Sequence, residues 1–207
     1  MNGELEFYTN PMSRGQIVRW MLEETGAPYE TRIITYGEEM KGEAYRAINP
    51  MGKVPAIVHK GHVVTECAAI CAYLADAFPD AGLATAPADR ADYYRWMFFA
   101  AGPLESAVTN KSLGFEPADD QQRMAGYGNF DLVMDVLEQA VSRTPYITGD
   151  QFTAADVYLG AQVGWGLQFG TMPKRAAFEE YWARISSREA YKTGSAKDQA
   201  LMPQEAV

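Results

Sequence analysis

The sequence predicts an α/β domain followed by an all-helical domain. Up to about residue 78, short apolar runs alternate with amphipathic segments. Beyond residue 90 no strand pattern is evident, and apolar residues recur with the helical period. The segment between them, PDAGLATAPAD (79–89), has the prolines, glycine and small residues of a linker. We therefore expect one domain over 1–80, a linker over 81–89 and a helical domain over 90–207.

The spacing of apolar residues predicts the elements of the first domain. Short β-branched or apolar runs predict strands over 5–8, 31–35, 54–58 and 62–64, the last two joined as a hairpin by Lys60-Gly61. Helical spacing predicts helices over 14–25 and 66–77, and Gly26 and Pro28 end the first of these. The order β-α-β-(α)-β-β-α is that of a thioredoxin-like domain with a mixed four-stranded sheet.

Four helices are expected in the second half. An aromatic-rich helix covers 90–110, and a second covers about 118–142. The capping box Thr153-x-x-Asp156 starts a third, and Pro173 opens a fourth. The tail after about Ser187 is polar, so we expect it to be at most partly ordered.

Composition excludes several classes of partner. The net charge of −9 argues against binding to nucleic acid or an anionic membrane. No apolar run approaches the ~18–20 residues of a membrane span, and no secretory signal is visible, so we expect a soluble cytoplasmic protein. Two cysteines, Cys67 and Cys71, cannot form a disulfide framework, and with two histidines they give no zinc pattern. We expect no metal.

Four motifs, in the right order, resemble the cytosolic glutathione transferase family. FYTNPMSRGQIVRWMLEETGAPYE (7–30) resembles the first strand, active-site turn and first helix, and is most similar to bacterial and fungal serine-type members. NPMGKVPAIV (49–58) matches the stretch with the cis-proline, and TECAAICAYLADAF (65–78) resembles the Glu-Ser helix start with cysteine replacing serine. GDQFTAADVYLG (149–160) matches the capping box of the bundle's core helix.

The resemblance covers essentially the whole chain and implies a function. It implies a homodimeric detoxification enzyme that conjugates the glutathione thiolate to an apolar electrophile, with glutathione as co-substrate and no cofactor. Glutathione-dependent peroxide or disulfide reduction is an alternative within enzymes. A non-catalytic ligand-binding or stress protein on the same fold is another, because fold does not fix function.

Ser13 is the first candidate for activating the thiol, because it directly precedes a predicted helix whose N-terminus favours an anion. Ser13-x-x-Gln16 also reads as a capping box, so helix capping is an alternative and compatible role. Tyr8 is the rival, because some classes of the family use a tyrosine at this strand end. An ungapped comparison with those classes also aligns Arg19-Trp20.

Seven other positions match glutathione-binding residues of the family: Arg14, Lys41, Lys53, Val54, Pro55, Glu66 and Cys67. The resemblance implies that the backbone before the cis-proline binds the cysteinyl part. It places the two lysines near the glycine carboxylate and the arginine near the thiolate, although exposed basic side chains are also common solvent-facing residues. It also implies that Glu66 pairs with the γ-glutamyl ammonium. Cys67, whose thiol is a poorer donor than a serine hydroxyl, would bind the γ-glutamyl carboxylate chiefly through its backbone N–H. A lowered thiol pKa with redox sensitivity is the alternative at that position.

The resemblance puts the second substrate between the active-site turn and the helical domain. Candidates for the apolar wall of this electrophile pocket are Met12, Tyr93, Trp96, Met97 and Trp165. Aromatic residues at helical spacing are more often core residues, so we expect no more than half of them to line the pocket.

Overall fold

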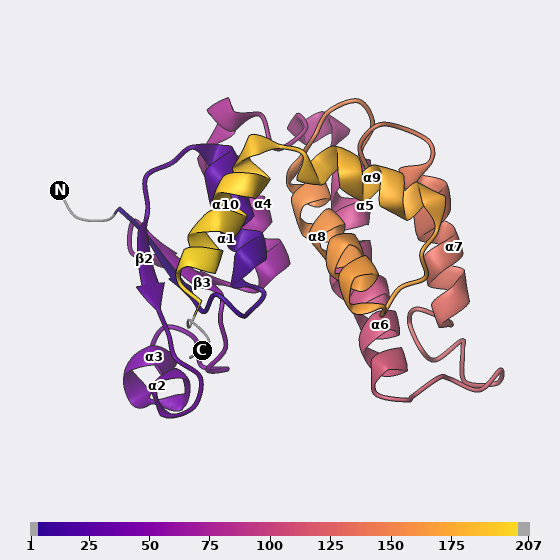
Figure 1. Cartoon of the computed structure of the whole chain (residues 1–207), viewed down its shortest axis with the longest axis horizontal. Coiled ribbons are helices and arrows are strands. Elements are labelled where there is room, and N and C mark those ends of the chain that lie inside the picture. The colour runs from indigo at the N-terminus through magenta and orange to yellow at the C-terminus, as the bar shows by residue number, and fades with distance from the viewer. Residues whose placement is uncertain (1–3, 203–207) are drawn as a thin grey trace, which may run out of the picture. The chain divides into compact units, whose positions relative to one another are not determined.

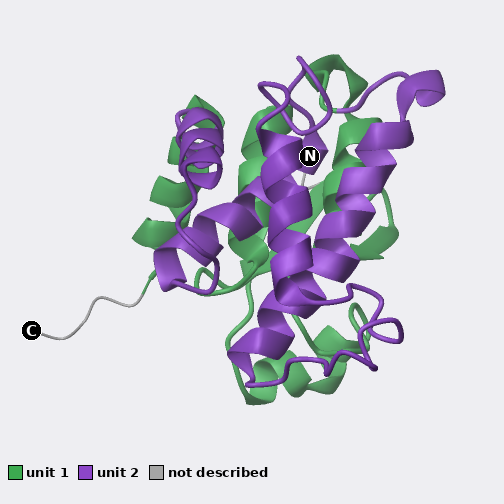
Figure 2. Cartoon of the chain, turned by 90° about the vertical axis from the view of Figure 1, so that its right-hand side faces the viewer, with its two compact units in different colours: residues 1–83, 188–207 green, residues 84–187 purple. Residues whose placement is uncertain are grey.

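The computed structural model describes residues 4–202, which divide into two compact units (Figure 2). The sheet unit comprises residues 4–83 and 188–202, and the helical unit comprises Ala84–Ser187. The second unit therefore begins within the expected linker. Residues 188–202, which we predicted to belong to the helical domain, are instead part of the sheet unit.

The sheet unit has the predicted thioredoxin-like fold (Figure 1). Its strands are β1 (Leu5–Thr9), β2 (Glu30–Ile33), β3 (Ala56–His59) and β4 (His62–Thr65), in the order β2-β1-β3-β4. β1 is parallel to β2 and antiparallel to β3, and β3 is antiparallel to β4. The helices are α1 (Gly15–Thr25), the short α2 (Glu38–Lys41) and α3 (Glu43–Arg46), and α4 (Cys67–Ala77), followed by the turn η1 (Pro79–Ala81).

The core of the sheet unit follows from the alternation in β1 and the apolar face of α1. Leu5, Phe7 and Thr9 are buried, whereas the intervening Glu6 and Tyr8 are partly exposed, as expected for a strand with period two. The buried apolar face of α1 consists of Ile17, Val18, Trp20, Met21 and Leu22. The αL residue Gly26 ends this helix.

The C-terminal tail forms a helix, α10 (Glu189–Ala200), which lies along α1 (Figure 1). Our prediction that the tail after about Ser187 is at most partly ordered was therefore wrong for residues 188–202, and residues 203–207 lie outside the described part of the chain. A Cβ at Gly194 would lie 3.3 Å from Arg19 Cγ and 3.4 Å from the backbone nitrogen of Trp20, so the two helices approach each other closely at this glycine. The Trp20 and Tyr191 rings pack edge-to-face at 5.0 Å between centroids.

The helical unit begins with the turn η2 (Pro87–Asp89) and contains the predicted long aromatic helix. This consists of α5 (Ala91–Phe99), the wider π-turn η3 (Ala100–Leu104) and α6 (Glu105–Ser112). The π-turn contains Pro103, which has no N–H to donate. The remaining helices are α7 (Phe130–Val141), α8 (Ala154–Phe169) and α9 (Ala176–Ser186).

Two helix starts in this unit differ from the predicted positions. The second helix was expected from residue 118 but begins at Phe130, after a segment whose Gly114 and Gly128 have positive φ. The fourth begins at Ala176 rather than at Pro173. The predicted capping box of Thr153 and Asp156 at the start of α8 is confirmed.

No helix within residues 4–202 is long and apolar enough to cross a membrane. Over the same residues, no three His, Cys, Asp or Glu side chains lie close enough together to hold a metal ion.

Candidate active site

Three loops meet at one end of the sheet. The register pairs Tyr8 with Ala56 and Ala56 with Thr65. The turn after β1, the Val54–Pro55 segment before β3 and the Glu66 turn after β4 are therefore neighbours. Because β2 runs parallel to β1, the loop that follows Ile33 also lies at this end.

Two backbone features mark this end of the sheet. The Val54–Pro55 peptide bond is cis, as the resemblance implied. Glu66, directly before α4, has φ 65° and ψ 119°, a conformation that non-glycine residues rarely adopt. Residues held in sparsely populated conformations cluster at ligand-binding sites. The position of Glu66 beside the cis-proline is consistent with such a site.

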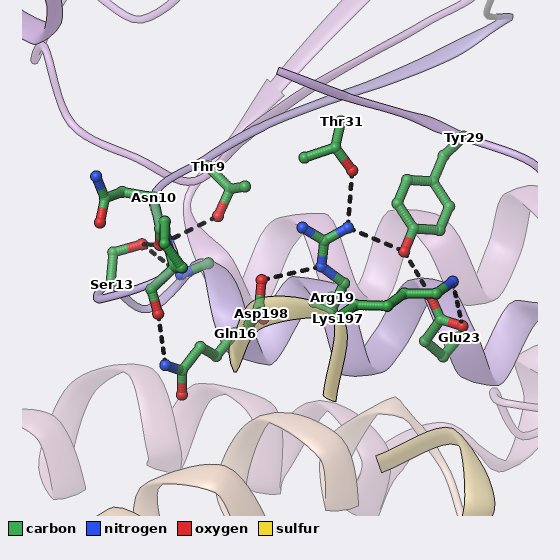
Figure 3. A network of polar contacts seen from close by, with 12 residues as sticks. Thr9, Asn10, Ser13, Gln16, Arg19, Glu23, Tyr29, Thr31, Lys197 and Asp198 are labelled. Atoms are coloured by element: carbon green, nitrogen blue, oxygen red, sulfur yellow. Dashed lines mark hydrogen bonds and ion pairs between the residues drawn. The ribbon is translucent and has the colours of Figure 1, made fainter. Parts of the chain in front are cut away.

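The Ser13 hydroxyl lies in a hydrogen-bonded turn between β1 and α1 (Figure 3). Its Oγ donates to the carbonyl oxygen of Asn10 at 2.6 Å and accepts from the backbone N–H of Gly15 at 2.9 Å. The side chain of Asn10 fixes this turn: its amide donates to the Ile34 carbonyl at 3.0 Å, and its Oδ1 accepts from the Met12 N–H at 3.0 Å. The hydroxyl is thus held at the start of α1 by short-range contacts.

The predicted capping box of Ser13 and Gln16 does not form. The amide of Gln16 donates to the Pro11 carbonyl at 2.6 Å instead (Figure 3), and α1 starts at Gly15, with Arg14 as the preceding residue. Ser13 still satisfies one N–H of the first helical turn, that of Gly15. The Ser13 backbone N–H, which the Gln16 side chain would accept from in a capping box, donates to the Asn10 carbonyl at 3.1 Å instead.

Close packing at the start of α1 requires glycine. A Cβ added to Gly15 would lie 1.9 Å from the Oγ1 atom of Thr9 and 3.0 Å from the Oγ atom of Ser13. Thr9 is fully buried at the end of β1. The glycine therefore lets α1 begin directly against the strand, beside the serine hydroxyl.

The hydroxyl of Tyr8, the rival candidate, donates to Glu6 Oε2 at 3.0 Å. The Tyr8 ring packs against the Tyr45 ring, with 6.0 Å between centroids. Burial, followed by the hydrogen bond to Glu6, raises the pKa of the Tyr8 phenol. A phenol whose proton is held by a neighbouring carboxylate is a poorer donor to another anion.

The three basic candidates differ in how they are held. Lys41 Nζ donates to the Gly52 carbonyl at 2.6 Å, so its ammonium is anchored to the loop before β3. The side chains of Arg14 and Lys53 are exposed. The backbone carbonyl of Lys53 accepts from the Tyr45 hydroxyl and from the Asn49 amide, each at 2.7 Å, which fixes the chain just before the cis-proline.

Cys67 joins the starts of two helices. Its Sγ donates to the carbonyl of Arg14 at 3.3 Å, so the first residue of α4 touches the turn that carries Ser13. Cys71, one turn further along α4, is buried, and burial raises its thiol pKa well above the usual value. Both cysteines are present as thiols, without a disulfide.

The candidates for the electrophile pocket fall into two groups. Met12 is 58% exposed in the turn beside Ser13. Tyr93, Trp96 and Met97 of the helical unit are at most 6% exposed, and Trp165 is partly buried. Side chains with almost no exposed surface pack as core, so their burial favours the core role that we weighed for them over the pocket role.

Sequence reasoning missed Asn10 and Tyr36. The Tyr36 hydroxyl donates to the Met12 carbonyl at 3.2 Å, although 24 positions separate the two residues. The Asn10-Pro11 pair is a turn signal that could have identified the asparagine. No pattern in the sequence indicates the contact of Tyr36.

A four-stranded sheet in the order β2-β1-β3-β4, with a cis-proline directly before β3, defines a protein of the thioredoxin-like class. The sequence profile of the glutathione S-transferase N-terminal domain matches residues 12–77. Glutathione S-transferase F10 of Arabidopsis thaliana is 30% identical over 198 residues, which are 85% of this chain and 89% of that protein. This chain therefore belongs to the glutathione S-transferase family and is a glutathione transferase.

Solved structures agree with this assignment. A glutathione transferase from Methylococcus capsulatus matches with a TM-score of 0.79 at 24% identity, covering 95% of this chain and 99% of that chain. A sphingomonad glutathione S-transferase complexed with glutathione matches with a TM-score of 0.74 at 25% identity, covering 94% and 98%. The fold is thus shared across the full length of bacterial members of the family.

Proposed function

We propose that the Ser13 hydroxyl stabilises the thiolate of bound glutathione, which then attacks an apolar electrophile. The observation that carries the proposal is the position of this hydroxyl, fixed at the start of α1 by Asn10 and Gly15. A helix start favours an anion through its N–H groups and dipole.

The Ser13 hydroxyl can exchange one hydrogen-bond acceptor for another at little cost in free energy. In the structure it is donated to the Asn10 carbonyl, and that carbonyl also accepts from the backbone N–H of Ser13 at 3.1 Å. Rotation of the hydroxyl toward a sulfur therefore leaves the carbonyl with a partner. The Gly15 N–H continues to donate to Oγ, which makes the hydroxyl a better donor.

The energy required is within reach of one hydroxyl. A thiol with a pKa of about 8.5 is roughly 3% ionised at pH 7, and one with a pKa of about 6.5 is roughly three-quarters ionised. The difference corresponds to about 2.7 kcal/mol. A hydrogen bond to a charged group contributes about 1.5–3 kcal/mol, and a helix N-terminus about 0.3–1 kcal/mol.

The remaining contacts to glutathione follow the family's pattern. The Val54 backbone before Pro55 would bind the cysteinyl part, and Glu66 the γ-glutamyl ammonium. The N–H of Cys67 would bind the γ-glutamyl carboxylate. The turn after β1, the Val54–Pro55 segment and the Glu66 turn are neighbours at one end of the sheet, which supports a common ligand.

Basic side chains would hold the other end of the tripeptide. Lys41 and Lys53 would lie near the glycine carboxylate, and Arg14 would add positive charge near the sulfur. Of these, Lys53 is exposed beside the cis-proline, whereas Lys41 would have to share its ammonium with the Gly52 carbonyl.

We propose that the second substrate is an apolar electrophile, as is typical of the family. We also propose that the chain forms a homodimer, which is likewise typical of the family. Conjugation is favoured over peroxide or disulfide reduction because the turn before α1, where the sulfur is proposed to bind, carries the Ser13 hydroxyl and no cysteine. Sedimentation velocity would test the dimer: a species of about twice the 22.9 kDa chain mass supports it, and a monomer rejects it.

The test of Ser13 compares Ser13→Ala with Tyr8→Phe. The pH dependence of the ultraviolet absorbance of bound glutathione thiolate gives its apparent pKa in each variant. We expect Ser13→Ala to raise this pKa by about 1 to 2, the equivalent of one hydrogen bond to an anion. Tyr8→Phe should leave it unchanged. The opposite result, a raised pKa in Tyr8→Phe alone, would assign the role to Tyr8.

A further inference from the structure

The loop after β2 is attached to the turn that carries Ser13. The Ile34 N–H donates to the Thr9 carbonyl at 2.8 Å, and the Asn10 amide donates back to the Ile34 carbonyl at 3.0 Å. Two residues further on, the Tyr36 hydroxyl donates to the Met12 carbonyl at 3.2 Å. The β2–α2 loop and the active-site turn therefore form one hydrogen-bonded structure within the sheet unit.

The same loop is also fixed on its other side. The carboxylate of Glu39 in α2 accepts from the Thr35 backbone N–H at 2.7 Å and from the Thr35 hydroxyl. Both hydrogen bonds lower the pKa of Glu39, and the one from the Thr35 hydroxyl has the larger effect. The backbone next to Tyr36 is thus held by α2, and the tip of its side chain is held by the active-site turn.

The Tyr36 ring is nonetheless 55% exposed, and the neighbouring Met12 is 58% exposed. These two large side chains belong to the two residues that this hydrogen bond joins. Because both are exposed, packing in the sheet core does not account for them. Met12 directly precedes Ser13 in the chain. An aromatic ring with its hydroxyl already bound, together with a polarizable thioether, is a surface suited to a flat aromatic molecule.

We propose that Tyr36 is a specificity-determining residue: its ring and the Met12 side chain form the surface on which a planar aromatic electrophile packs beside the glutathione sulfur. This inference rests on the proposed role of Ser13, which puts the sulfur next to Met12. With an aryl halide, the thiolate forms a bond to the ring carbon that bears the halogen, and the halide leaves with the bonding electron pair. The thiol proton has already gone to solvent.

The test uses two variants and two electrophiles on the full-length enzyme. Tyr36→Phe removes the hydrogen bond to Met12 and keeps the ring, whereas Tyr36→Leu removes both. For each variant, kcat/KM is measured with 1-chloro-2,4-dinitrobenzene and with allyl isothiocyanate. The second electrophile is not aromatic: the thiolate bonds to its central carbon, and its nitrogen accepts a proton. The ratio of the two kcat/KM values reports the preference for an aromatic electrophile independently of enzyme concentration and fold integrity.

We expect Tyr36→Leu to lower this ratio about 2- to 12-fold, the range that one aromatic contact contributes, and Tyr36→Phe to keep it. An unchanged ratio in Tyr36→Leu, or an equal loss in Tyr36→Phe, would overturn the proposal. The pKa of bound thiol should be the same in wild type and Tyr36→Leu. A failure of the Ser13 assignment would appear separately, as an unchanged thiol pKa in Ser13→Ala.

Discussion

Arg19 on α1 and Asp198 on α10 form a buried ion pair, with 3.1 Å between Nε and Oδ1 and 2% of each side chain exposed (Figure 3). The guanidinium also donates to the hydroxyls of Thr31 at 2.7 Å and Tyr29 at 3.1 Å, so it links α10, α1 and β2. It lies over the Phe7 ring, 5.0 Å from its centroid. The ion pair thereby holds α10 against α1, the helix that starts at the proposed thiol site.

Removal of one partner of this pair should be costly. We expect Asp198→Ala to lower the free energy of unfolding by about 3–5 kcal/mol, because it leaves the Arg19 charge buried without compensation. The double variant Arg19→Leu/Asp198→Leu should lose less than Asp198→Ala alone, since no charge remains. Urea-induced unfolding followed by circular dichroism measures both. Equal stability of Asp198→Ala and wild type would contradict the prediction.

The contact between α10 and α1 also explains why the sequence did not predict α10. Its polar composition suggests disorder, and its stability comes from partners about 170 positions away. Lys197 pairs with Glu23 at 2.7 Å, and Arg188 with Glu24 at 2.7 Å, in addition to the buried pair. Local propensity cannot reveal such long-range pairs, and tertiary packing supplies most helical stability.

The elements of the sheet unit could be predicted because each had a local signal. Strand alternation, the Gly26 stop and the Lys60-Gly61 hairpin all lie within a few residues of what they determine. The helical unit was less predictable at the start of α7, where Gly128, with a positive φ, interrupts the expected helix. In the site, the role of Ser13 stays a prediction. The capping box with Gln16 was wrong because the Ser13 N–H donates to the Asn10 carbonyl within the turn, and the Gln16 amide donates to the Pro11 carbonyl.

Asp156 should make the stability of the helical unit depend on pH. Its Oδ1 accepts from the Ile147 N–H at 2.7 Å and the Tyr181 hydroxyl at 2.9 Å, and its Oδ2 accepts from the Thr153 N–H at 2.9 Å. Burial outweighs these contacts and raises the pKa to about 6 from 3.8. The native carboxyl therefore binds its proton more tightly than the unfolded one.

The sign follows from linkage: stability falls with rising pH wherever the native state binds more protons. For this residue the loss is about 3 kcal/mol, spread between roughly pH 4 and pH 6. We expect Asp156→Asn to flatten that pH dependence, although its overall stability is lower because the amide nitrogen cannot accept. Unfolding curves of both proteins at several pH values from 4 to 7 provide the measurement. Parallel pH profiles for the two proteins would show that Asp156 is not responsible.

Gly15→Ala should disturb the active-site turn, because the new Cβ would meet Thr9 Oγ1 at 1.9 Å. We expect destabilisation by about 1–3 kcal/mol from overpacking and a raised pKa of bound glutathione thiol, since the Ser13 hydroxyl must move. Thr9→Ala in the same chain removes the clashing oxygen and should restore part of both. Gly126→Ala is the matched control, because nothing lies within 4 Å of its added Cβ. A normal thiol pKa in Gly15→Ala would show that the serine tolerates the shift.

Cys67→Ser should tighten glutathione binding. The Cys67 thiol is a weak donor that now contacts the Arg14 carbonyl at 3.3 Å, and a hydroxyl would donate more strongly to the γ-glutamyl carboxylate proposed to bind here. A hydrogen bond to a charged group contributes about 1.5–3 kcal/mol, but the new hydroxyl must give up a contact to the Arg14 carbonyl, so we expect a fall in KM for glutathione of about 2- to 12-fold. The kcat should not change, because activation of the sulfur is proposed to depend on Ser13. Cys67→Ala is the control: it keeps the backbone N–H and should have the KM of wild type. An increased KM in Cys67→Ala would mean that the thiol itself already contributes to binding, and an unchanged KM in Cys67→Ser would mean that the side chain does not face the ligand.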